Sequence, residues 1–368
     1  MYVIKKELDI LPFNDWNPNK GEHLLIAGPC GAETEEQVLQ TAEGIAQNKQ
    51  IKVFRAGIWK PRTRPNSFEG VGEKGLKWLK RVQKEHGLLT TVEVANKEHT
   101  ELALKHGVDI LWIGARTTVN PFSVQEIADV LKGTDVPVMI KNPVHPDLQL
   151  WIGAIERIQQ AGINKIVAIH RGFHDPHKGI YRNAPLWEIP IELKTIFPNL
   201  PVVCDPSHIG GKRNLLKEIA QKSLDLGMQG LMIESHIHPQ QALSDAQQQL
   251  TPDALQQLLS ELLFRQTSST DKKFNNKLHN LRNIIDELDE EMMLLLQKRM
   301  AIIEQIGEYK KDNNVSIFQL ERWREILKTR IHSGVDKNLD KEFIEKFCQL
   351  LHEESIRVQN ELMNKEST

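Results

Sequence analysis

Four side chains of kinds that bind transition metals lie at the ends of short apolar runs far apart in the sequence. Cys30 ends the apolar run 23–30. His208 and Glu234 end two later runs, and Asp245 follows shortly after the last of them. If these runs are neighbouring strands of one closed barrel, a thiol, an imidazole and two carboxylates meet at a single rim. This mixed set of ligands predicts a divalent metal site that suits Mn²⁺, Fe²⁺, Co²⁺ or Zn²⁺ better than Mg²⁺ or Ca²⁺.

Basic side chains end most of the other apolar runs: Arg55, Lys60, Arg62, Arg116, Lys141 and Arg171. A single arginine at a strand end is usually part of a surface ion pair, and Cys30 or His208 taken alone is more simply a core or capped loop residue. So many cations at one barrel mouth, however, would repel each other unless anions filled the site. Because guanidinium groups bind phosphate and carboxylate with two parallel hydrogen bonds, this pattern predicts two phosphorylated small-molecule substrates.

The elements that must position these residues alternate between short β-branched runs and amphipathic helical segments. We expect strands near 23–30, 52–59, 88–94, 110–115, 137–142, 165–172, 201–208 and 230–236. Eight such units over roughly 240 residues are typical of an α/β protein with a (β/α)8 TIM barrel. We therefore expect a barrel domain over residues 1–265, a polar linker over 266–273 and an all-α helical domain over 274–368.

Composition limits the class of protein. The net charge is −2 and the pI is about 6.7, which gives no reason to expect nucleic acid or an anionic membrane as a partner. Three cysteines in 368 residues are too few for a disulfide framework and favour a reducing compartment. We find no signal-peptide pattern and no apolar run near the roughly 18 residues of a membrane span. The expected location is the cytoplasm.

Five motifs, in order along the chain, carry a family resemblance: residues 28–33, 60–63, 113–116, 205–211 and 243–245. They resemble the 3-deoxy-D-arabino-heptulosonate 7-phosphate (DAHP) synthases, in the short type I subgroup that shares its barrel with the 3-deoxy-octulosonate 8-phosphate synthases. The resemblance implies condensation of phosphoenolpyruvate with erythrose 4-phosphate. The sister reaction with arabinose 5-phosphate is the alternative, and residues 60–63 argue against it because that family typically has Asn in the corresponding motif.

The same resemblance implies roles for the residues above. It makes Cys30, His208, Glu234 and Asp245 the metal ligands. Phosphoenolpyruvate would be held by Arg55, Lys60, Arg116, Lys141 and Arg171. Erythrose phosphate would be held by Arg62 and Thr63. Lys60 would also be catalytic, because an ammonium group beside the aldehyde can protonate the alkoxide that forms.

The helical segment carries two cations on an apolar face. At 100° per residue, six side chains fall within about 20° of one line: Leu281, Leu288, Met292, Arg299, Ile306 and Lys310. Buried charges without partners are costly, so an anionic ligand should meet Arg299 and Lys310. The alternative is that both side chains extend to solvent from a helix-bundle interface.

Residues 274–363 resemble the all-α class of chorismate mutase, which rearranges chorismate to prephenate. The family's ligand positions correspond to Arg282, Arg299, Lys310, Arg322, Ser355 and Gln359. Arg299, Lys310 and Gln359 would be catalytic: the arginine would fix a substrate carboxylate in the reactive conformation, while Lys310 and Gln359 would hydrogen-bond the ether oxygen as charge develops there. Arg282 lies off the stripe, which suits a homodimer in which one protomer lends an arginine to the other. Where the family often has acids near the substrate hydroxyl, this chain has Gln319 and Trp323.

Two interpretations of the whole chain follow. In the first it is a bifunctional enzyme, DAHP synthase followed by chorismate mutase. In the second the helical domain is a non-catalytic module that binds a pathway product and regulates the barrel. Because only about 20 residues precede the first expected strand, we expect the helical domain to carry feedback control, with prephenate as the effector.

Overall fold

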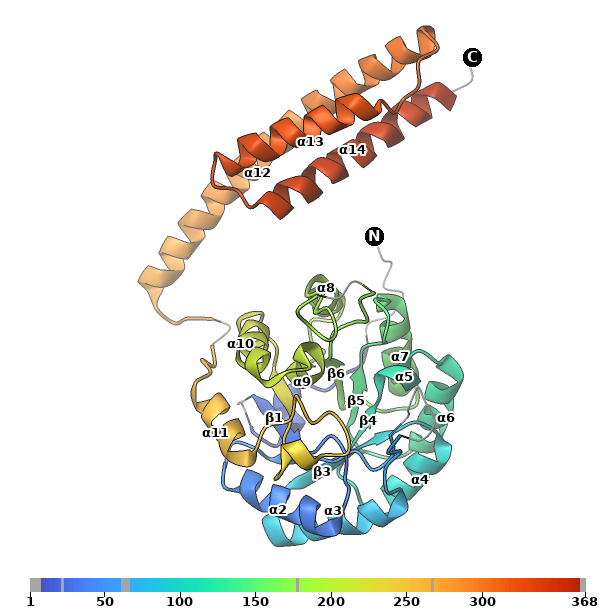
Figure 1. Cartoon of the computed structure of the whole chain (residues 1–368), viewed down its shortest axis with the longest axis vertical. Coiled ribbons are helices and arrows are strands. Elements are labelled where there is room, and N and C mark those ends of the chain that lie inside the picture. The colour runs from blue at the N-terminus through green and yellow to red at the C-terminus, as the bar shows by residue number, and fades with distance from the viewer. Residues whose placement is uncertain (1–7, 21–22, 61–66, 177–178, 266–267, 365–368) are drawn as a thin grey trace. The chain divides into compact units, whose positions relative to one another are not determined.

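The structure is a computed structural model of the 368-residue chain, and it describes residues 8–20, 23–60, 67–176, 179–265 and 268–364. Two compact units make up the chain, residues 1–267 and 268–368 (Figure 1). The division falls within the predicted linker 266–273, although helix α12 already begins at Lys272.

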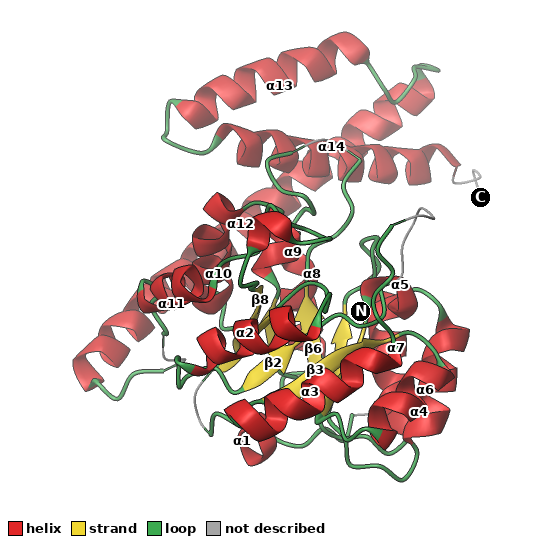
Figure 2. Cartoon of the chain, turned by 60° about the horizontal axis from the view of Figure 1, so that its bottom comes forward, coloured by secondary structure: helices red, strands yellow, loops and turns green. Residues whose placement is uncertain are grey.

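The first unit is a closed parallel barrel, as the sequence predicted. In its described part, eight strands pair in sequence order and β1 closes the ring by pairing with β8. Figure 2 shows the yellow strands enclosed by red helices. The strands are β1 Leu24–Gly28, β2 Val53–Arg55, β3 Leu89–Val94, β4 Ile110–Ile113, β5 Val138–Lys141, β6 Ile166–His170, β7 Val202–Cys204 and β8 Gly230–Glu234. All are shorter than or equal to their predicted ranges. Their carboxyl ends meet at one mouth, where barrels of this type carry their chemistry.

Side chains alternate between two apolar layers along each strand. In β4, Ile110 and Trp112 point into the barrel and belong to its inner core. Leu111 and Ile113 point outward and belong to the layer between strands and helices. This period of two is what a pleated strand imposes, and it decides which strand-end residues face the mouth.

Helices cover the outside of the barrel. The longer ones are α2 Glu35–Ala46, α3 Glu73–His86, α4 Lys97–Lys105, α6 Pro121–Leu131, α7 Leu148–Gln160, α8 Glu188–Ile196, α10 Leu216–Asp225 and α11 Pro252–Ser260. The short ones are α1 Phe13–Trp16, α5 Ala115–Thr118, α9 Pro206–Gly210, η1 Arg213–Leu215 and η2 Pro239–Gln241. Of these, α1 packs Phe13 and Trp16 against the inner core of the barrel and does not cover its outside. Several begin with a side-chain cap: the Thr34 hydroxyl, for example, accepts from Gln37 N at 3.1 Å at the start of α2, which satisfies a backbone donor of the first turn.

Two predicted strands, 23–30 and 201–208, run past their real ends in ways that affect candidate ligands. β1 ends at Gly28, so Cys30 follows the strand and does not end it. β7 ends at Cys204, and the chain then turns into α9 because Asp205 caps that helix and Pro206 occupies its first position. The Asp205 side chain accepts from His208 N at 3.0 Å, and a proline at the first helical position costs no hydrogen bond. His208 therefore lies on a short helix beyond the strand, and the expectation that it ends the strand was wrong.

The second unit contains three helices and, among residues 268–364, no strand. They are α12 Lys272–Asp312, α13 Leu320–Val335 and α14 Lys341–Asn364. Both α12 and α13 pack on α14. The approach of α12 to α14 is close at Gly307, where an added Cβ would lie 3.1 Å from the Gln359 Cγ atom.

The apolar stripe predicted on α12 is largely exposed in the single chain. Leu281, Leu288, Met292 and Ile306 are between 41% and 53% exposed. Exposed apolar surface along a helix is a feature of interaction sites. Among the residues that the structure describes, no helix is both long and apolar enough to cross a membrane.

Candidate active sites

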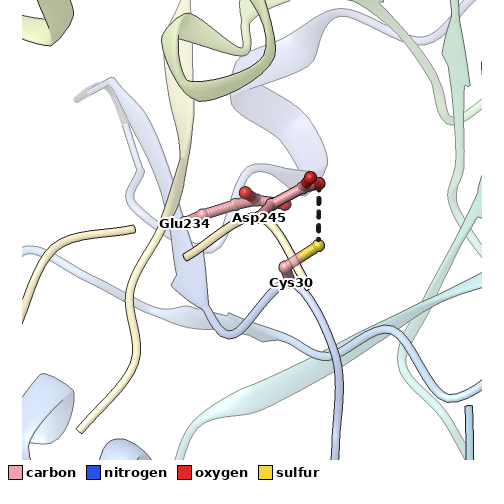
Figure 3. A group of neighbouring side chains, drawn as sticks. All are labelled: Cys30, Glu234 and Asp245. Atoms are coloured by element: carbon pink, nitrogen blue, oxygen red, sulfur yellow. Dashed lines mark hydrogen bonds between the residues drawn. The ribbon is translucent and has the colours of Figure 1, made fainter. Parts of the chain in front are cut away.

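Cys30, Glu234 and Asp245 form a compact group at the barrel mouth (Figure 3). Their possible ligand atoms lie within 4.8 Å of one another, and the Cys30 thiol donates to Asp245 Oδ2 at 3.2 Å. Glu234 is the last residue of β8, while Cys30 follows β1, which pairs with β8. Residues more than 200 positions apart meet because the barrel closes between these two strands.

The backbone around Cys30 is held from several sides. A Cβ at Gly28, whose φ is +148°, would lie 2.0 Å from Arg55 O, so glycine permits the chain to leave β1 close against β2. Gln249 Oε1 accepts from Cys30 N at 2.9 Å. The Lys60 ammonium group donates to Cys30 O at 2.7 Å and to its Sγ at 2.8 Å. The thiol therefore has a fixed direction.

His208 flanks this group through a second carboxylate. Its Nε2 atom lies 3.7 Å from Glu234 Oε1, and its Nδ1 atom lies 2.7 Å from Asp205 Oδ2. A carboxylate on one ring nitrogen commonly orients the other nitrogen of a metal-binding histidine. His208 is therefore not one of the three residues whose ligand atoms gather, but it adjoins them through Glu234 and is supported by Asp205.

The donor set fits a divalent transition metal. A thiol, an imidazole and two carboxylates combine soft and hard ligands. Burial, together with Glu234, raises the pKa of Cys30 to about 12. Because the thiolate is the form that binds metal, a divalent ion held by these residues would add to the positive charge of Lys60 and favour ionisation of the thiol.

Two buried cations, Arg55 and Lys141, face the same mouth. Arg55 Nη2 lies 3.2 Å from Glu234 Oε1, and Lys141 Nζ lies 2.8 Å from Asp205 Oδ2. Burial would raise the pKa of Asp205, but His208 and Lys141 hold it well below its usual value. The Trp112 ring lies beneath both cations, 5.1 Å from the Arg55 guanidinium carbon and 6.0 Å from Lys141 Nζ.

Other predicted cations lie around this pair. The Arg171 guanidinium donates to Asn183 Oδ1 at 2.9 Å, and burial lowers its pKa to about 10. Arg116 lies on α5 beyond β4, and its charge contributes to that lowering. Arg62 and Thr63 lie outside the described residues.

A polar network that the sequence analysis did not identify surrounds the carboxylates. Arg182 Nη1 donates to Asp245 Oδ1 at 3.0 Å and to Gln248 Oε1 at 2.7 Å. Gln248 Nε2 in turn donates to Glu234 Oε2 at 2.6 Å. These bonds fix one oxygen of each carboxylate and leave the other toward Cys30 or His208.

In the helical unit, three of the predicted ligand residues come together between α12 and α14. Arg299 Nη1 donates to Ser355 Oγ at 2.9 Å, and Gln359 Nε2 donates to Ser355 O at 3.0 Å. Ser355 and Gln359 are 4% and 5% exposed. Lys310 Nζ donates to Ile317 O at 2.5 Å. Burial lowers the pKa of both Arg299 and Lys310, as expected for cations on a partly apolar surface.

Two predicted mutase residues do not join this cluster within one chain. Arg322 is exposed on α13 and pairs with Glu325, with 2.6 Å between Nη1 and Oε2. Arg282 precedes Arg299 by 17 positions on α12, which is about 25 Å at the rise of an α-helix. Within a single protomer, Arg282 therefore cannot bind the same small ligand as Arg299.

Comparison with known proteins agrees with this division. Residues 14–269 match the DAHP synthetase I family. The chain belongs to that family. Residues 281–360 match the chorismate mutase type II family, so the chain is a DAHP synthase domain fused to a chorismate mutase domain.

Individual relatives match the DAHP synthase domain. The phospho-2-dehydro-3-deoxyheptonate aldolase of Thermotoga maritima is 30% identical over 253 residues, which are 69% of this chain and 72% of that protein. A crystal structure of the Thermotoga DAHP synthase aligns with a TM-score of 0.61 at 29% identity, covering 69% of this chain and 72% of that one. A 2-dehydro-3-deoxyphosphooctonate aldolase of Legionella pneumophila is 28% identical over 256 residues, 65% of this chain and 89% of that protein.

Proposed function

We propose that the barrel condenses phosphoenolpyruvate with erythrose 4-phosphate to give DAHP and phosphate. The observation that carries this proposal is the pair of buried cations, Arg55 and Lys141, beside the group of Cys30, Glu234 and Asp245. Two anionic reactants would meet where positive charge and possible metal ligands adjoin. The relationship to the Thermotoga protein supports the same reaction.

Each residue has a role in this scheme. A divalent ion, with Mn²⁺ preferred, would be held by Cys30, His208, Glu234 and Asp245 and supplies Lewis acidity toward a carbonyl oxygen. Phosphoenolpyruvate would be bound by Arg55, Lys60, Arg116, Lys141 and Arg171. Erythrose phosphate would be bound by Arg62 and Thr63.

The condensation requires one proton donor. As the enol carbon bonds to the aldehyde carbon, the aldehyde oxygen becomes an alkoxide and must gain a proton. Lys60, whose ammonium group lies 2.8 Å from Cys30 Sγ, is suited to donate it. Water then adds at the former enol-ether carbon, and the C–O bond to phosphate breaks. The fixed cations hold both reactants in a reactive orientation.

The alternative substrate is arabinose 5-phosphate, since phosphooctonate aldolases are also relatives. The test compares the two aldoses with phosphoenolpyruvate and follows phosphate release and the C7 or C8 product. Formation of the C7 product with kcat/KM at least tenfold higher for erythrose 4-phosphate supports the proposal. Preference for arabinose 5-phosphate would reassign the barrel.

We propose further that the helical domain rearranges chorismate to prephenate. Arg299 and Lys310 would bind the carboxylates and ether oxygen, with Ser355 and Gln359 completing the site. Arg282 and Arg322 would contact the substrate from a homodimer, in which Arg282 comes from the second protomer. The exposed apolar stripe on α12 supports such a dimer. An assay of chorismate loss tests this function, and a chain with no mutase activity would favour a non-catalytic regulatory module.

Prephenate is the proposed effector of the barrel reaction, because the helical domain would already recognise a dicarboxylate of this shape. The phosphorylated substrates and the three unbridged cysteines, Cys30, Cys204 and Cys348, support a reducing cytoplasm as the place of action.

A further inference from the structure

Trp323, which stands where related enzymes often carry an acid, forms an aromatic pair with His352 in the helical unit. The Trp323 ring on α13 stacks on the His352 ring on α14, with centroids 4.0 Å apart and planes inclined by 12°. The Phe318 ring lies 5.8 Å from the same imidazole. Two aromatic neighbours therefore fix the plane in which the His352 ring nitrogens lie.

His352 belongs to the same helical face as the residues that bind Arg299. On α14, positions 352, 355 and 359 are spaced by three and four, so His352 forms one stripe with Ser355 and Gln359. The preceding residue, Leu351, offers its carbonyl oxygen to Arg299 Nη1 at 3.5 Å. His352 therefore lines the proposed mutase site.

Two buried polar atoms along this stripe have no hydrogen-bond partner among the described residues: His352 Nε2 and Gln359 Oε1. Burying such atoms without partners costs stability. A ligand hydroxyl can satisfy the ring nitrogen of His352, because a hydroxyl both donates and accepts. Arg299 and Lys310 are suited to bind the anionic groups of a ligand. Neither is assigned to an uncharged hydroxyl of that ligand, so the hydroxyl needs another partner.

The charge state of the imidazole suits a neutral hydroxyl. Burial lowers the pKa of His352, and Arg299 and Lys310 lower it further, while Glu353 opposes the change. His352 is then neutral at neutral pH, with one ring nitrogen donating and the other accepting. A neutral imidazole avoids adding a third positive charge beside the two cations.

We propose that His352 binds the ring hydroxyl of chorismate through Nε2 and that Trp323 positions the imidazole by stacking on it. This inference rests on the proposed mutase function. It assigns the hydroxyl-binding role to a residue of α14. The site can then recognise the hydroxyl even though Trp323 and an exposed Gln319 occupy the positions where acids are common.

The test compares the wild-type chain with a variant, each assayed with two substrates. The variant His352→Phe keeps an aromatic ring against Trp323 but removes both ring nitrogens. Mutase kcat/KM is measured for chorismate and for a chorismate analogue that lacks the ring hydroxyl. We expect the wild-type chain to prefer chorismate by roughly 10- to 100-fold, since one lost hydrogen bond leaves a buried partner unsatisfied. We expect His352→Phe to lose this preference.

The matched control is His332→Phe, because that imidazole is 81% exposed on α13; it should keep the wild-type preference. A second variant, His352→Gln, keeps a hydrogen-bonding side chain and should retain part of the preference, which guards against a packing defect in His352→Phe. If either His352 variant discriminates between the substrates as strongly as the wild type, the inference is wrong. If the wild-type chain lacks mutase activity, the proposed function itself fails, which is a different result.

Discussion

Asp205 Oδ2 lies 2.7 Å from His208 Nδ1 and 2.8 Å from Lys141 Nζ. One buried carboxylate therefore orients a proposed metal ligand and balances a proposed substrate-binding cation. Because the same oxygen contacts both groups, the proposed metal site and the proposed anion site share a single residue.

The first prediction follows from this coupling. Asp205→Asn removes the charge but keeps the size of the side chain, so His208 loses the partner that orients it. We expect metal affinity to fall about 10- to 100-fold, with activity partly recovered at high Mn²⁺. Titration of metal-free protein with Mn²⁺ measures this. The control is Asp225→Asn, which removes a surface partner of Arg265; equal affinities in the two variants would contradict the prediction.

A second prediction concerns metal removal. Chelation should abolish the condensation, and Mn²⁺ or a similar ion should restore it in the wild-type chain. Cys30→Ala should bind metal more weakly, because it lacks the soft ligand. Cys204→Ala is the matched control, since that thiol lies in the core layer outside the barrel and should leave metal binding unchanged. Full activity of chelated Cys30→Ala would exclude a metal role for this group.

The third prediction concerns Trp112, which lies beneath Arg55 and Lys141. Cation–π contacts to a buried indole contribute about 1–2 kcal/mol, so we expect Trp112→Leu to raise the KM for phosphoenolpyruvate roughly tenfold. Trp112→Phe keeps a ring face and should show a smaller rise. The measurement is steady-state kinetics with varied phosphoenolpyruvate concentration. An unchanged KM in Trp112→Leu would show that the indole contributes packing alone.

The sequence predicted the barrel because β-branched runs and amphipathic segments alternate with the period of β/α units. It predicted that Cys30, Glu234, Arg55 and Lys141 approach the mouth, because strand ends converge in any closed parallel barrel. The prediction for Arg62 and Thr63 falls outside the described residues. It did not distinguish a strand end from the cap of a short helix, so His208 was placed on a strand instead of on α9. The local signal was the Asp205-Pro206 pair, a helix start.

Other residues escaped sequence reasoning because their roles depend on contacts across the fold. Trp112 looks like an ordinary apolar strand residue, and only its inward direction brings it under the cations. Arg182 reads as a loop residue until its contact with Asp245 is known. His352 sits in a helix of mixed composition, where periodicity alone does not identify its stacking partner.

A fourth prediction uses the lowered pKa of Lys310. Burial favours the neutral amine, so the pKa lies below the ordinary lysine value of 10.5. The proposed hydrogen bond to the ether oxygen needs the protonated form, which is lost as pH rises through that pKa. We therefore expect mutase kcat/KM, which reports ionisation in the free enzyme, to fall on the alkaline side, at a pH below 10.5. Lys310→Arg should move this fall to higher pH. A pH profile identical to that of the wild type would show that another group causes the alkaline fall.

The last prediction concerns feedback. If prephenate inhibits the barrel reaction, it must bind more tightly to a state of the chain in which condensation is slow. A coupling of about 1–3 kcal/mol corresponds to a 5- to 150-fold effect on affinity. Linkage is reciprocal, so saturating the barrel with substrates should weaken prephenate binding by the same factor.

The measurement is condensation rate against prephenate concentration for the wild-type chain and for Arg299→Ala. The variant loses a proposed contact to a prephenate carboxylate, so its inhibition curve should move to higher concentration by about tenfold or more. Its uninhibited condensation rate should stay unchanged, because Arg299 lies on α12 of the helical unit. Inhibition of both proteins at the same concentration would indicate that prephenate acts at the barrel, where the dense positive charge around Arg55 and Lys141 offers a competing site for any dicarboxylate.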